Sequence, residues 1–318
     1  MFKKRVIYLS TFNKTKNSGI FYRQFINKNN FVEIKEVEMN LKKINFFYYL
    51  KLFKKLKKII NKDDIIHSQY GSACGLIGSF FPNKKIITLR GSDIQNNGLI
   101  EDFYSFLVNK LTLLYLNKYN FIIVVSKKIK KKLIKNKIKK KIIFLPSPVD
   151  QDKFFRISRV EAKKILNLKL SKKYIFFPVI NHKIKNKNYN FILNLKNRLK
   201  KENIHLLTAN NKYNQKKMNL LFNACDCTVL VSNMEGWPNV IKESIFCDTP
   251  IVSTNVSDLK LLALKSKYIQ ICNLDIEEFY NKIQLILKFK RPNNLKKMIY
   301  FCKLKYHLDI IKSLYNKI

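Results

Sequence analysis

Two glutamates, Glu235 and Glu243, flank the only tryptophan of the chain in the run MEGWPNVIKESIF. The segment CTVLVS before them has the pattern of a buried strand, and NVIKESIF begins a helix. Glu235 therefore falls in a loop, and Glu243 about one turn into the helix. Carboxylates placed in this way can accept hydrogen bonds from the paired hydroxyls of sugar and ribose rings. The alternative for any two glutamates taken alone is a solvated surface.

A glycoside hydrolase also uses two carboxylates, but it places them roughly 5–9.5 Å apart around one bond. The eight helical positions from Glu235 to Glu243 would span ~12 Å. Two separate hydroxyl contacts therefore fit this spacing better than one acid/base pair.

The loop between this strand and helix is also placed to hold phosphate. In open α/β sheets ligands lie beyond the carboxyl ends of strands, where a helix N-terminus presents unpaired N–H groups and partial positive charge. Gly236 is the only glycine after Gly98. We therefore expect its backbone to adopt φ > 0 or to approach a ligand closely, the alternative being a simple tight turn.

The elements that must position these residues follow from the apolar pattern. Short β-branched runs alternate with longer amphipathic ones, which predicts parallel sheets covered on both faces. The first set of expected strands covers Arg5–Ser10, Phe31–Val37, Asp64–Ser68, Lys85–Leu89, Phe121–Ser126 and Lys141–Leu145. The second set covers Tyr174–Val179, Asn203–Ala209, Cys227–Ser232, Pro250–Thr254 and Tyr268–Cys272. Two doubly wound α/β domains are expected, joined near Pro146–Asp152.

The formal charge of +42 is typical of nucleic-acid binders, but its composition argues otherwise. Only seven of the 63 basic residues are Arg, which leaves 56 Lys spread along a chain rich in Asn, Ile, Phe and Tyr. Neither an RNP pattern nor zinc-finger spacing is present. The charge is either compositional, on solvated faces, or serves at an anionic membrane surface. We expect no nucleic-acid partner.

The segment Tyr49–Ile60 sorts its residues by helical period, with Leu52, Phe53 and Leu56 on one face and lysines on the other. One interpretation is a helix that covers the sheet and exposes a solvated lysine face. The other is a helix near a membrane surface, its lysines facing anionic headgroups.

The six cysteines form no CxxC pair and no zinc spacing with the four histidines, so they are expected to be small buried residues in a reducing compartment. The start MFKKRVIYLSTF is too short for a signal-peptide core, and apolar runs elsewhere fall short of a membrane span. Asp150 and Asp152 form an Asp-x-Asp, but in the hinge and away from the strand-end loop. The expectation is a cytoplasmic protein, peripheral on the inner membrane face at most, with no metal site.

The run NACDCTVLVSNMEGWPNVIKESIFCDTPIVSTNVSD resembles the donor-binding signature of the family-4 retaining glycosyltransferases (glycosyl transferases group 1), including its Glu-x7-Glu element. Five earlier segments also occur in the family's order and spacing: DIIHSQYG, ITLRGSD, VVSKKIKKKL, PSPVDQDKF and KNKNYN. The resemblance implies an α/β GT-B fold, two Rossmann-like domains facing across a cleft. Residues 1–148 would form the acceptor-side domain and 149–303 the nucleotide-sugar domain, with 304–318 a helix packing back on the first.

The same resemblance assigns roles to single residues. Glu235 would contact the donor sugar, Glu243 the ribose, and Lys187 the donor diphosphate. Lys183 or Lys185 would replace an arginine that the family often carries, and Gly19 matches an N-terminal glycine loop only weakly. The loop and first helical turn would also bind the donor, through Gly236, Trp237, Pro238, Asn239 and Val240.

Departures from the family pattern lie mainly on the acceptor side. Arg90 stands where relatives frequently carry His, and Asp93 faces the acceptor or caps a helix. The implied activity is transfer of a sugar from a nucleoside-diphosphate sugar to a glycan or lipid-linked acceptor, in cell-surface polysaccharide or lipopolysaccharide synthesis, without metal or other cofactor. A sugar-nucleotide epimerase on the same fold, or a basic nucleic-acid-binding protein, are the alternatives.

Overall fold

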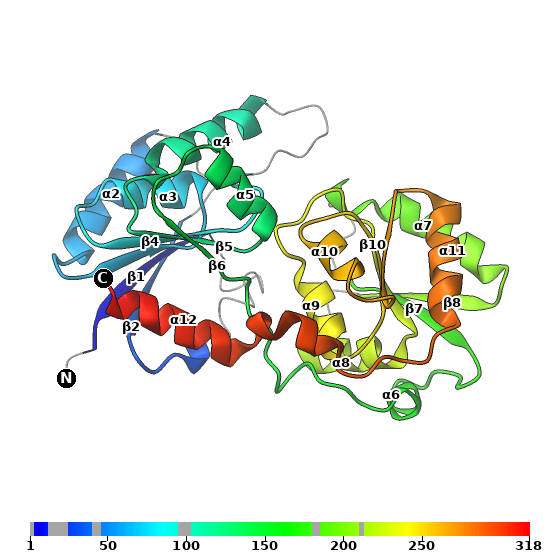
Figure 1. Cartoon of the computed structure of the whole chain (residues 1–318). Coiled ribbons are helices and arrows are strands. Elements are labelled where there is room, and N and C mark those ends of the chain that lie inside the picture. Colours follow the sequence, from blue (N-terminus) through cyan, green and yellow to red (C-terminus); the bar gives the residue numbers. More distant parts are fainter. Residues whose placement is uncertain (1–2, 12–24, 40–45, 95–102, 180–184, 210–212) are drawn as a thin grey trace. The chain divides into compact units, whose positions relative to one another are not determined.

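The computed structural model describes residues 3–11, 25–39, 46–94, 103–179, 185–209 and 213–318, drawn in colour in Figure 1. Contacts divide the chain into two compact units. Unit 1 comprises Met1–Pro148 together with Leu304–Ile318, and unit 2 comprises Val149–Lys303. Gly19 and Lys183 lie outside the described residues, as does the side chain of Lys185.

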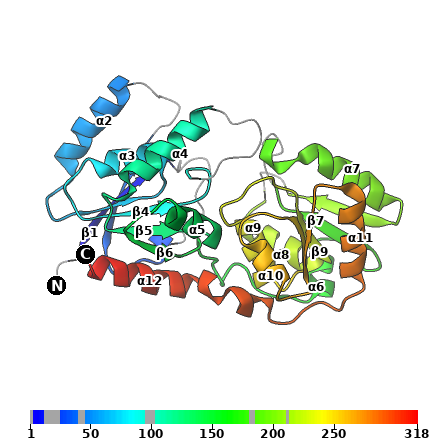
Figure 2. The same ribbon diagram turned by 45° about the horizontal axis from the view of Figure 1, so that its top comes forward.

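In the described part of unit 1, six parallel strands form a sheet in the order β2-β1-β3-β4-β5-β6. The strands are β1 (Arg5–Ser10), β2 (Glu33–Glu38), β3 (Ile65–Ser68), β4 (Lys85–Leu89), β5 (Phe121–Val124) and β6 (Lys141–Phe144). The helices are α2 (Phe46–Ile59), α3 (Ser72–Ser79), α4 (Phe103–Leu116), α5 (Lys127–Lys135) and, from the end of the chain, α12 (Leu304–Asn316). Figures 1 and 2 show α12 on one face of the sheet and α2 and α3 on the other.

Strand β1 packs on both faces because its side chains alternate. Ile7 and Leu9 join the cluster with Leu56 of α2 and Ile77 of α3. Val6 and Tyr8 join the opposite cluster, with Ile311, Leu314 and Tyr315 of α12. Leu52 and Leu56 of α2 are thus buried and Phe53 is half-buried, while the lysines of the helix are exposed, as the sheet-covering interpretation predicts.

A polar network lies inside the α12 contact. The Tyr315 hydroxyl is 2.7 Å from the Tyr8 hydroxyl and 2.7 Å from Nδ1 of His67, whose Nε2 lies 2.8 Å from the Thr88 hydroxyl. Burial lowers the pKa of His67 well below its usual value, so the ring is neutral and can both donate and accept. The network therefore ties α12 to β1, β3 and β4 without burying a charge.

In the described part of unit 2, five parallel strands form a sheet in the order β11-β10-β9-β7-β8. The strands are β7 (Lys173–Phe177), β8 (Ile204–Thr208), β9 (Cys227–Leu230), β10 (Ile251–Thr254) and β11 (Ile269–Cys272). The helical elements are α6 (Arg159–Ile165), η2 (Lys185–Lys187), α7 (Tyr189–Lys200), α8 (Gln215–Ala224), α9 (Asn239–Phe246), α10 (Leu259–Ala263), α11 (Ile276–Leu287) and η3 (Leu295–Cys302).

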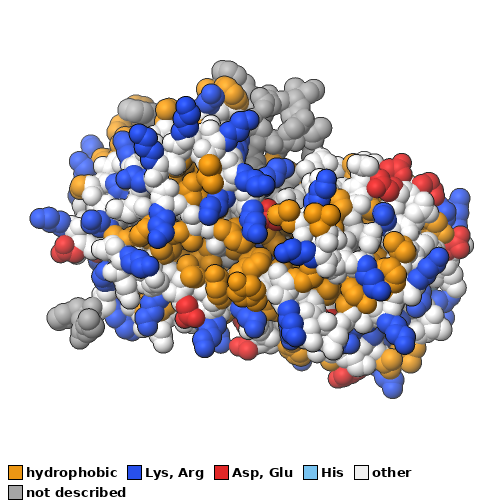
Figure 3. All heavy atoms as spheres, in the orientation of Figure 1, with side chains coloured by type: hydrophobic (Ala, Val, Ile, Leu, Met, Phe, Trp, Pro, Cys, Tyr) orange, Lys and Arg blue, Asp and Glu red, His pale blue; other side chains and the backbone are white. Residues whose placement is uncertain are grey.

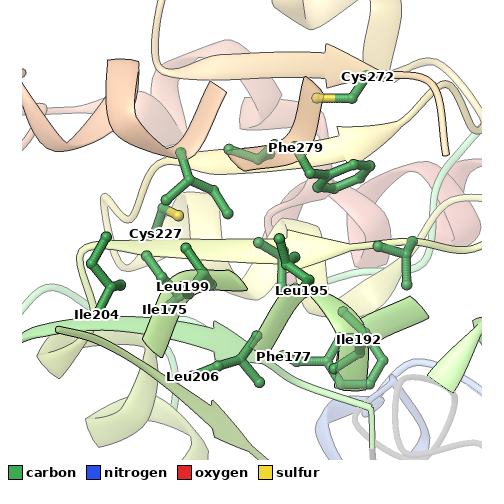
Figure 4. Packing of buried hydrophobic residues seen from close by; sticks show 14 of the residues in the cluster. Ile175, Phe177, Ile192, Leu195, Leu199, Ile204, Leu206, Cys227, Cys272 and Phe279 are labelled. Atoms are coloured by element: carbon green, nitrogen blue, oxygen red, sulfur yellow. The ribbon is translucent and has the colours of Figure 1, made fainter. Parts of the chain in front are cut away.

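One core cluster of unit 2 lies between this sheet and helices α7 and α11. Figure 4 shows Leu195 and Leu199 of α7 packed over Ile175 and Phe177 of β7, with Phe279 of α11 in the same cluster. All six cysteines are free and buried, so they act as small apolar residues, as expected from their spacing. No helix in the described part of the chain is long and apolar enough to cross a membrane.

Replacing Tyr315 by Phe should lower the free energy of unfolding by about 1–2 kcal/mol, because the buried Tyr8 hydroxyl and His67 Nδ1 each lose a partner. Urea-induced unfolding measures the change. Tyr300→Phe is the matched control, since Tyr300 is 57% exposed. Equal stability of the two variants would contradict a stabilising role for the network.

Candidate functional site

The loop that follows β9 leads directly into α9, as the sequence pattern predicts. Pro238 precedes the helix with φ −64°, the value that its ring fixes, and provides no side-chain cap. The first intrahelical bond runs from the N–H of Lys242 to the carbonyl of Pro238. The N–H groups of Asn239, Val240 and Ile241 therefore have no partner within the helix, and this end of α9 favours an anion.

Two predicted site residues from separate loops are in direct contact. The ammonium of Lys187, at the end of η2, forms an ion pair with Oε1 of Glu235 and also lies 3.4 Å from the Ser232 hydroxyl. The two charged side chains are 21% and 18% exposed. The opposite charges of Lys187 and Glu235 therefore compensate each other at a partly buried position in the loop that precedes α9.

Asn186 and Asn188 hold this pair in place, and neither was among the residues expected from the sequence. The Asn186 amide donates to the Met234 carbonyl at 2.7 Å and accepts from the Met234 N–H at 2.9 Å. Asn188 begins α7 in the left-handed conformation, φ 47°, and donates to the Val231 carbonyl. The signal in the sequence was an asparagine on each side of Lys187 in KNKNYN.

Residues at and just after the end of β10 support the other side of the loop. The Thr254 hydroxyl donates to the Ser232 carbonyl, and the Ser257 hydroxyl donates to the Gly236 carbonyl. Gly236 does not adopt the positive φ that its isolation in the sequence suggested, since Gly91 is the one described glycine in that region. The loop turns without left-handed backbone at Gly236 because these side chains hold its carbonyls. Close approach to a ligand stays a prediction for Gly236.

Glu243 lies on α9 and is half-buried. Burial raises its pKa to about 7, against a smaller opposing effect of the neighbouring Lys242 ammonium. Lys242 itself is buried, with its ammonium 5.6 Å from the centre of the Trp237 ring. Among the described residues nothing forms a hydrogen bond or ion pair with the Glu243 carboxylate. This carboxyl can therefore take a ligand hydroxyl without breaking such a contact.

The remaining donor-loop residues differ in exposure. Trp237 and Pro238 are buried, whereas Asn239 and Val240 are half-buried. Because the Trp237 and Pro238 side chains are buried, their contact with a donor stays a prediction that would involve the backbone.

Asp93, in unit 1, is fully buried and anchors a turn. Its carboxylate accepts hydrogen bonds from the N–H groups of Gly71 at 2.8 Å, Gly91 at 2.8 Å and Arg90 at 3.1 Å. Burial raises the pKa of Asp93, while these N–H groups oppose the shift. The carboxylate therefore holds the backbone of this turn, and both the helix-cap and the acceptor-contact alternatives stay predictions.

Arg90 follows β4 and donates to three groups of unit 1. Its guanidinium bonds the Gln69 carbonyl at 3.0 Å, the Gln69 side-chain oxygen at 2.6 Å and the Ser147 hydroxyl at 2.9 Å. It lines a small cavity together with His67, Thr88 and His307. These bonds fix the position of Arg90, and its contact with an acceptor stays a prediction.

No group of three or more His, Cys, Asp or Glu side chains that could hold a metal ion occurs among the described residues. In the Asp-x-Asp of the hinge, the side chain of Asp150 supports a local turn. Asp150 is buried, accepts from the N–H of Asp152 at 3.1 Å and lies 3.6 Å from the Lys153 ammonium.

Replacing Asn186 by Ala should lower the free energy of unfolding by about 1–2 kcal/mol, because the part-buried N–H and carbonyl of Met234 lose their partners. The measurement is urea-induced unfolding. Asn197→Ala, at an exposed position of α7, is the control and should leave stability nearly unchanged. If both variants unfold alike, Asn186 does not hold the loop.

The raised pKa of Glu243 predicts a pH-dependent stability. Folding favours the protonated form, so stability present below the usual value of 4.5 is lost as pH rises towards about 7. Relative to Glu243→Gln, the wild type should lose up to about 2–3 kcal/mol between acid and mildly alkaline pH. Urea unfolding at a series of pH values measures this difference. Glu161→Gln, at an exposed position of α6, should show no comparable trend, and a flat difference for Glu243 would contradict the raised pKa.

Comparison with known families and structures supplies independent information. The family model described as "Glycosyl transferases group 1" matches residues 128–305. A comparison with curated protein sequences gives no match.

Several solved structures share the fold. Sucrose-phosphate synthase from Thermosynechococcus elongatus is similar with a TM-score of 0.78 and 12% identity, over 99% of each chain. The α,α-trehalose-phosphate synthase (UDP-forming) from Burkholderia xenovorans, in complex with glucose-6-phosphate, has a TM-score of 0.71 and 9% identity, over 99% of each chain. Anabaena HepE, in complex with UDP and glucose, has a TM-score of 0.66 and 10% identity, over 98% of this chain and 99% of that chain.

At these identities the structures establish the fold, and they confirm the two-sheet GT-B architecture that the sequence predicted. The family match covers more than half of the chain. It includes Glu235 in the β9–α9 loop, Glu243 in α9, and Lys187 with its two neighbouring asparagines. The chain therefore belongs to the group 1 glycosyl transferases.

Proposed function

We propose that this protein is a retaining glycosyltransferase that moves a sugar from a nucleoside-diphosphate sugar to a glycan or lipid-linked acceptor without a metal ion. The observation that carries the proposal is the contact between Lys187 and Glu235 beside the uncapped start of α9. A cation and a carboxylate thus meet in the loop that leads into the uncapped α9, and the half-buried Glu243 lies on that helix.

The diphosphate of the donor fits the start of α9, where N–H groups and the helix dipole favour negative charge. A phosphate oxygen would then compete with Glu235 for the Lys187 ammonium. As Lys187 turns to the phosphate, Glu235 becomes free to accept hydrogen bonds from sugar hydroxyls. Donor binding would thus exchange an internal ion pair for two contacts with the donor.

Lys187 would also act on the rate. When the bond between sugar and phosphate breaks, negative charge grows on the leaving diphosphate, and a fixed cation beside it lowers the barrier. Lys187 and the N-terminus of α9 together supply the positive charge that a metal ion supplies in other transferases. No side chain is assigned as a nucleophile, in keeping with front-face attack, in which the leaving phosphate takes the acceptor proton.

Glu243 would hold the ribose of the nucleotide. With a pKa near 7 its carboxyl can accept a hydrogen bond when ionised and also donate one when protonated. A ribose diol offers both donors and acceptors, so it satisfies this carboxyl in either state.

Support for the nucleotide comes from the solved relatives. HepE was solved with UDP and glucose, and a trehalose-phosphate synthase of the same fold is described as UDP-forming. UDP-sugars are therefore the first donors to test. For the acceptor we propose a glycan or lipid-linked glycan of a cell-surface polysaccharide or lipopolysaccharide, met by a cytoplasmic enzyme at the inner membrane face.

The proposal is tested by release of nucleoside diphosphate from UDP-, GDP- and ADP-sugars, with membrane extract as acceptor. One donor should turn over, without loss of rate in EDTA and with retained anomeric configuration in the product. Lys187→Ala should lower kcat about 10²–10³-fold because the leaving diphosphate loses its cation. The control is Lys196→Ala, an exposed lysine of α7.

Other outcomes would overturn the proposal. Conversion of the donor sugar with no acceptor present would identify an epimerase. Binding of RNA or DNA without any binding of a sugar nucleotide would return the basic surface to a nucleic-acid role. Equal kcat for the two lysine variants would remove Lys187 from the reaction.

A further inference from the structure

Helix α4 exposes three of its five leucines. Leu107, Leu111 and Leu114 are 42%, 47% and 76% exposed, and their spacing of four and three places them in one stripe along the helix. The buried side of the same helix contains Asn109 and Thr112. Tyr115 and Leu116 are buried as well, so α4 has apolar residues on both sides, whereas a helix that covers a sheet usually keeps its exposed side polar.

Contacts with α3 fix α4 in this rotation. The Thr112 hydroxyl accepts from the N–H of Ser72, and the Tyr115 hydroxyl donates to the Ser72 carbonyl. The fit is close, since a Cβ on Gly75 would lie 2.5 Å from the Tyr115 hydroxyl oxygen. Rotating α4 to bury the exposed leucines would break these hydrogen bonds. The packing of α4 against α3 therefore keeps the leucines exposed.

The leucine stripe continues onto α2 through Phe80. The Lys118 ammonium lies 5.5 Å from the centre of the Phe80 ring, which is 6.2 Å from the ring of Phe53 in α2. Phe80 is 58% exposed, and Phe47, at the start of α2, is 78% exposed. Figures 1 and 2 show α2 and α4 on the same side of the unit 1 sheet.

We call this surface the α2–α4 face. Its apolar members are Phe47, Leu50, Phe80, Leu107, Leu111 and Leu114. Its exposed cations are Lys51, Lys54, Lys55, Lys57, Lys58, Lys110 and Lys118.

The charge of the face is of one sign. Neither α2 nor α4 contains a single Asp or Glu. A second copy of the chain would bring lysine against lysine, which costs free energy. Nucleic acid would meet the lysines but leave the leucines without an apolar partner. An anionic bilayer satisfies both, because headgroups attract lysines by about 1 kcal/mol each and the interfacial region accepts leucine and phenylalanine.

We propose that the α2–α4 face docks unit 1 on an anionic lipid surface, with Leu107, Leu111 and Leu114 entering the interface and the lysines contacting headgroups. This docking needs neither a membrane-spanning segment nor catalytic turnover. It would bring an enzyme that uses a lipid-linked acceptor to that acceptor, and it stands or falls independently of the glycosyl transfer proposed above.

Co-sedimentation of the full chain with vesicles tests the proposal. Wild type should bind vesicles of phosphatidylcholine mixed with phosphatidylglycerol and bind pure phosphatidylcholine far more weakly. Leu114→Glu should lower the partition coefficient about tenfold or more, because it replaces an inserted apolar side chain by a repelled charge. The matched control is Leu264→Glu in unit 2, since Leu264 is 78% exposed against 76% for Leu114.

Both leucines are solvent-exposed, so the variants should fold, which circular dichroism checks. Equal effects of the two substitutions, equal binding to both lipid mixtures, or no binding at all would overturn the proposal. So would a wild-type dimer that Leu114→Glu converts to a monomer without lipid binding, since the face would then join two copies. Measuring sugar-nucleotide binding by the same variants, which should be unchanged, separates this result from failure of the proposed function.

Discussion

The parallel order of the strands is the constraint on which the functional geometry depends. Parallel neighbours need crossover helices, so all loops at the carboxyl ends of the strands gather at one edge of the sheet. In unit 2 the neighbours β10, β9 and β7 place three such loops side by side. Lys187 follows β7, Glu235 follows β9, and Ser257 follows β10. Their meeting is a consequence of strand order, since 47 residues separate the first two in sequence.

Electrostatics then determines how this edge behaves without a ligand. The ion pair of Lys187 and Glu235 compensates two partly buried charges that would each be costly alone. Glu243 has no such partner among the described residues, and its carboxyl is held near neutrality by burial instead. One carboxylate is thus paired with a cation, whereas the other has a pKa that burial raises to about 7. The difference suits a ligand that presents both a charged diphosphate and uncharged hydroxyls.

The large positive charge of the chain has no single explanation. Figure 3 shows Lys and Arg side chains spread over both units on the visible face, with few acidic groups among them. Most of these lysines lie on solvated faces, as the overall composition suggests. On α2 and α4 the same lysines surround exposed leucine and phenylalanine side chains, so the charge there coincides with an apolar surface. Composition could not separate the two situations, because it counts charges without placing them.

Periodicity along the chain was sufficient for the elements. Every predicted strand overlaps an observed one, and the α2 segment was recognised from the spacing of Leu52 and Leu56. These features are local: burial repeats every second residue in a strand and about every third or fourth in a helix, so the sequence itself records them. The order of the motifs was enough to identify the family and the GT-B fold.

Tertiary structure decided what depends on contacts between distant residues. Neighbouring loops determine three features of this kind. Asn186 forms hydrogen bonds with Met234, Asp93 is buried against backbone N–H groups, and Gly236 keeps a negative φ. The rotation of α4 likewise follows from its hydrogen bonds to α3, which leave Leu107, Leu111 and Leu114 exposed. The sequence by itself determined which elements form and the family they belong to. Only the packed structure determined which side chains meet. A hydrogen bond requires a donor–acceptor distance that is correct to within a few tenths of an ångström, and no residue pattern records such distances.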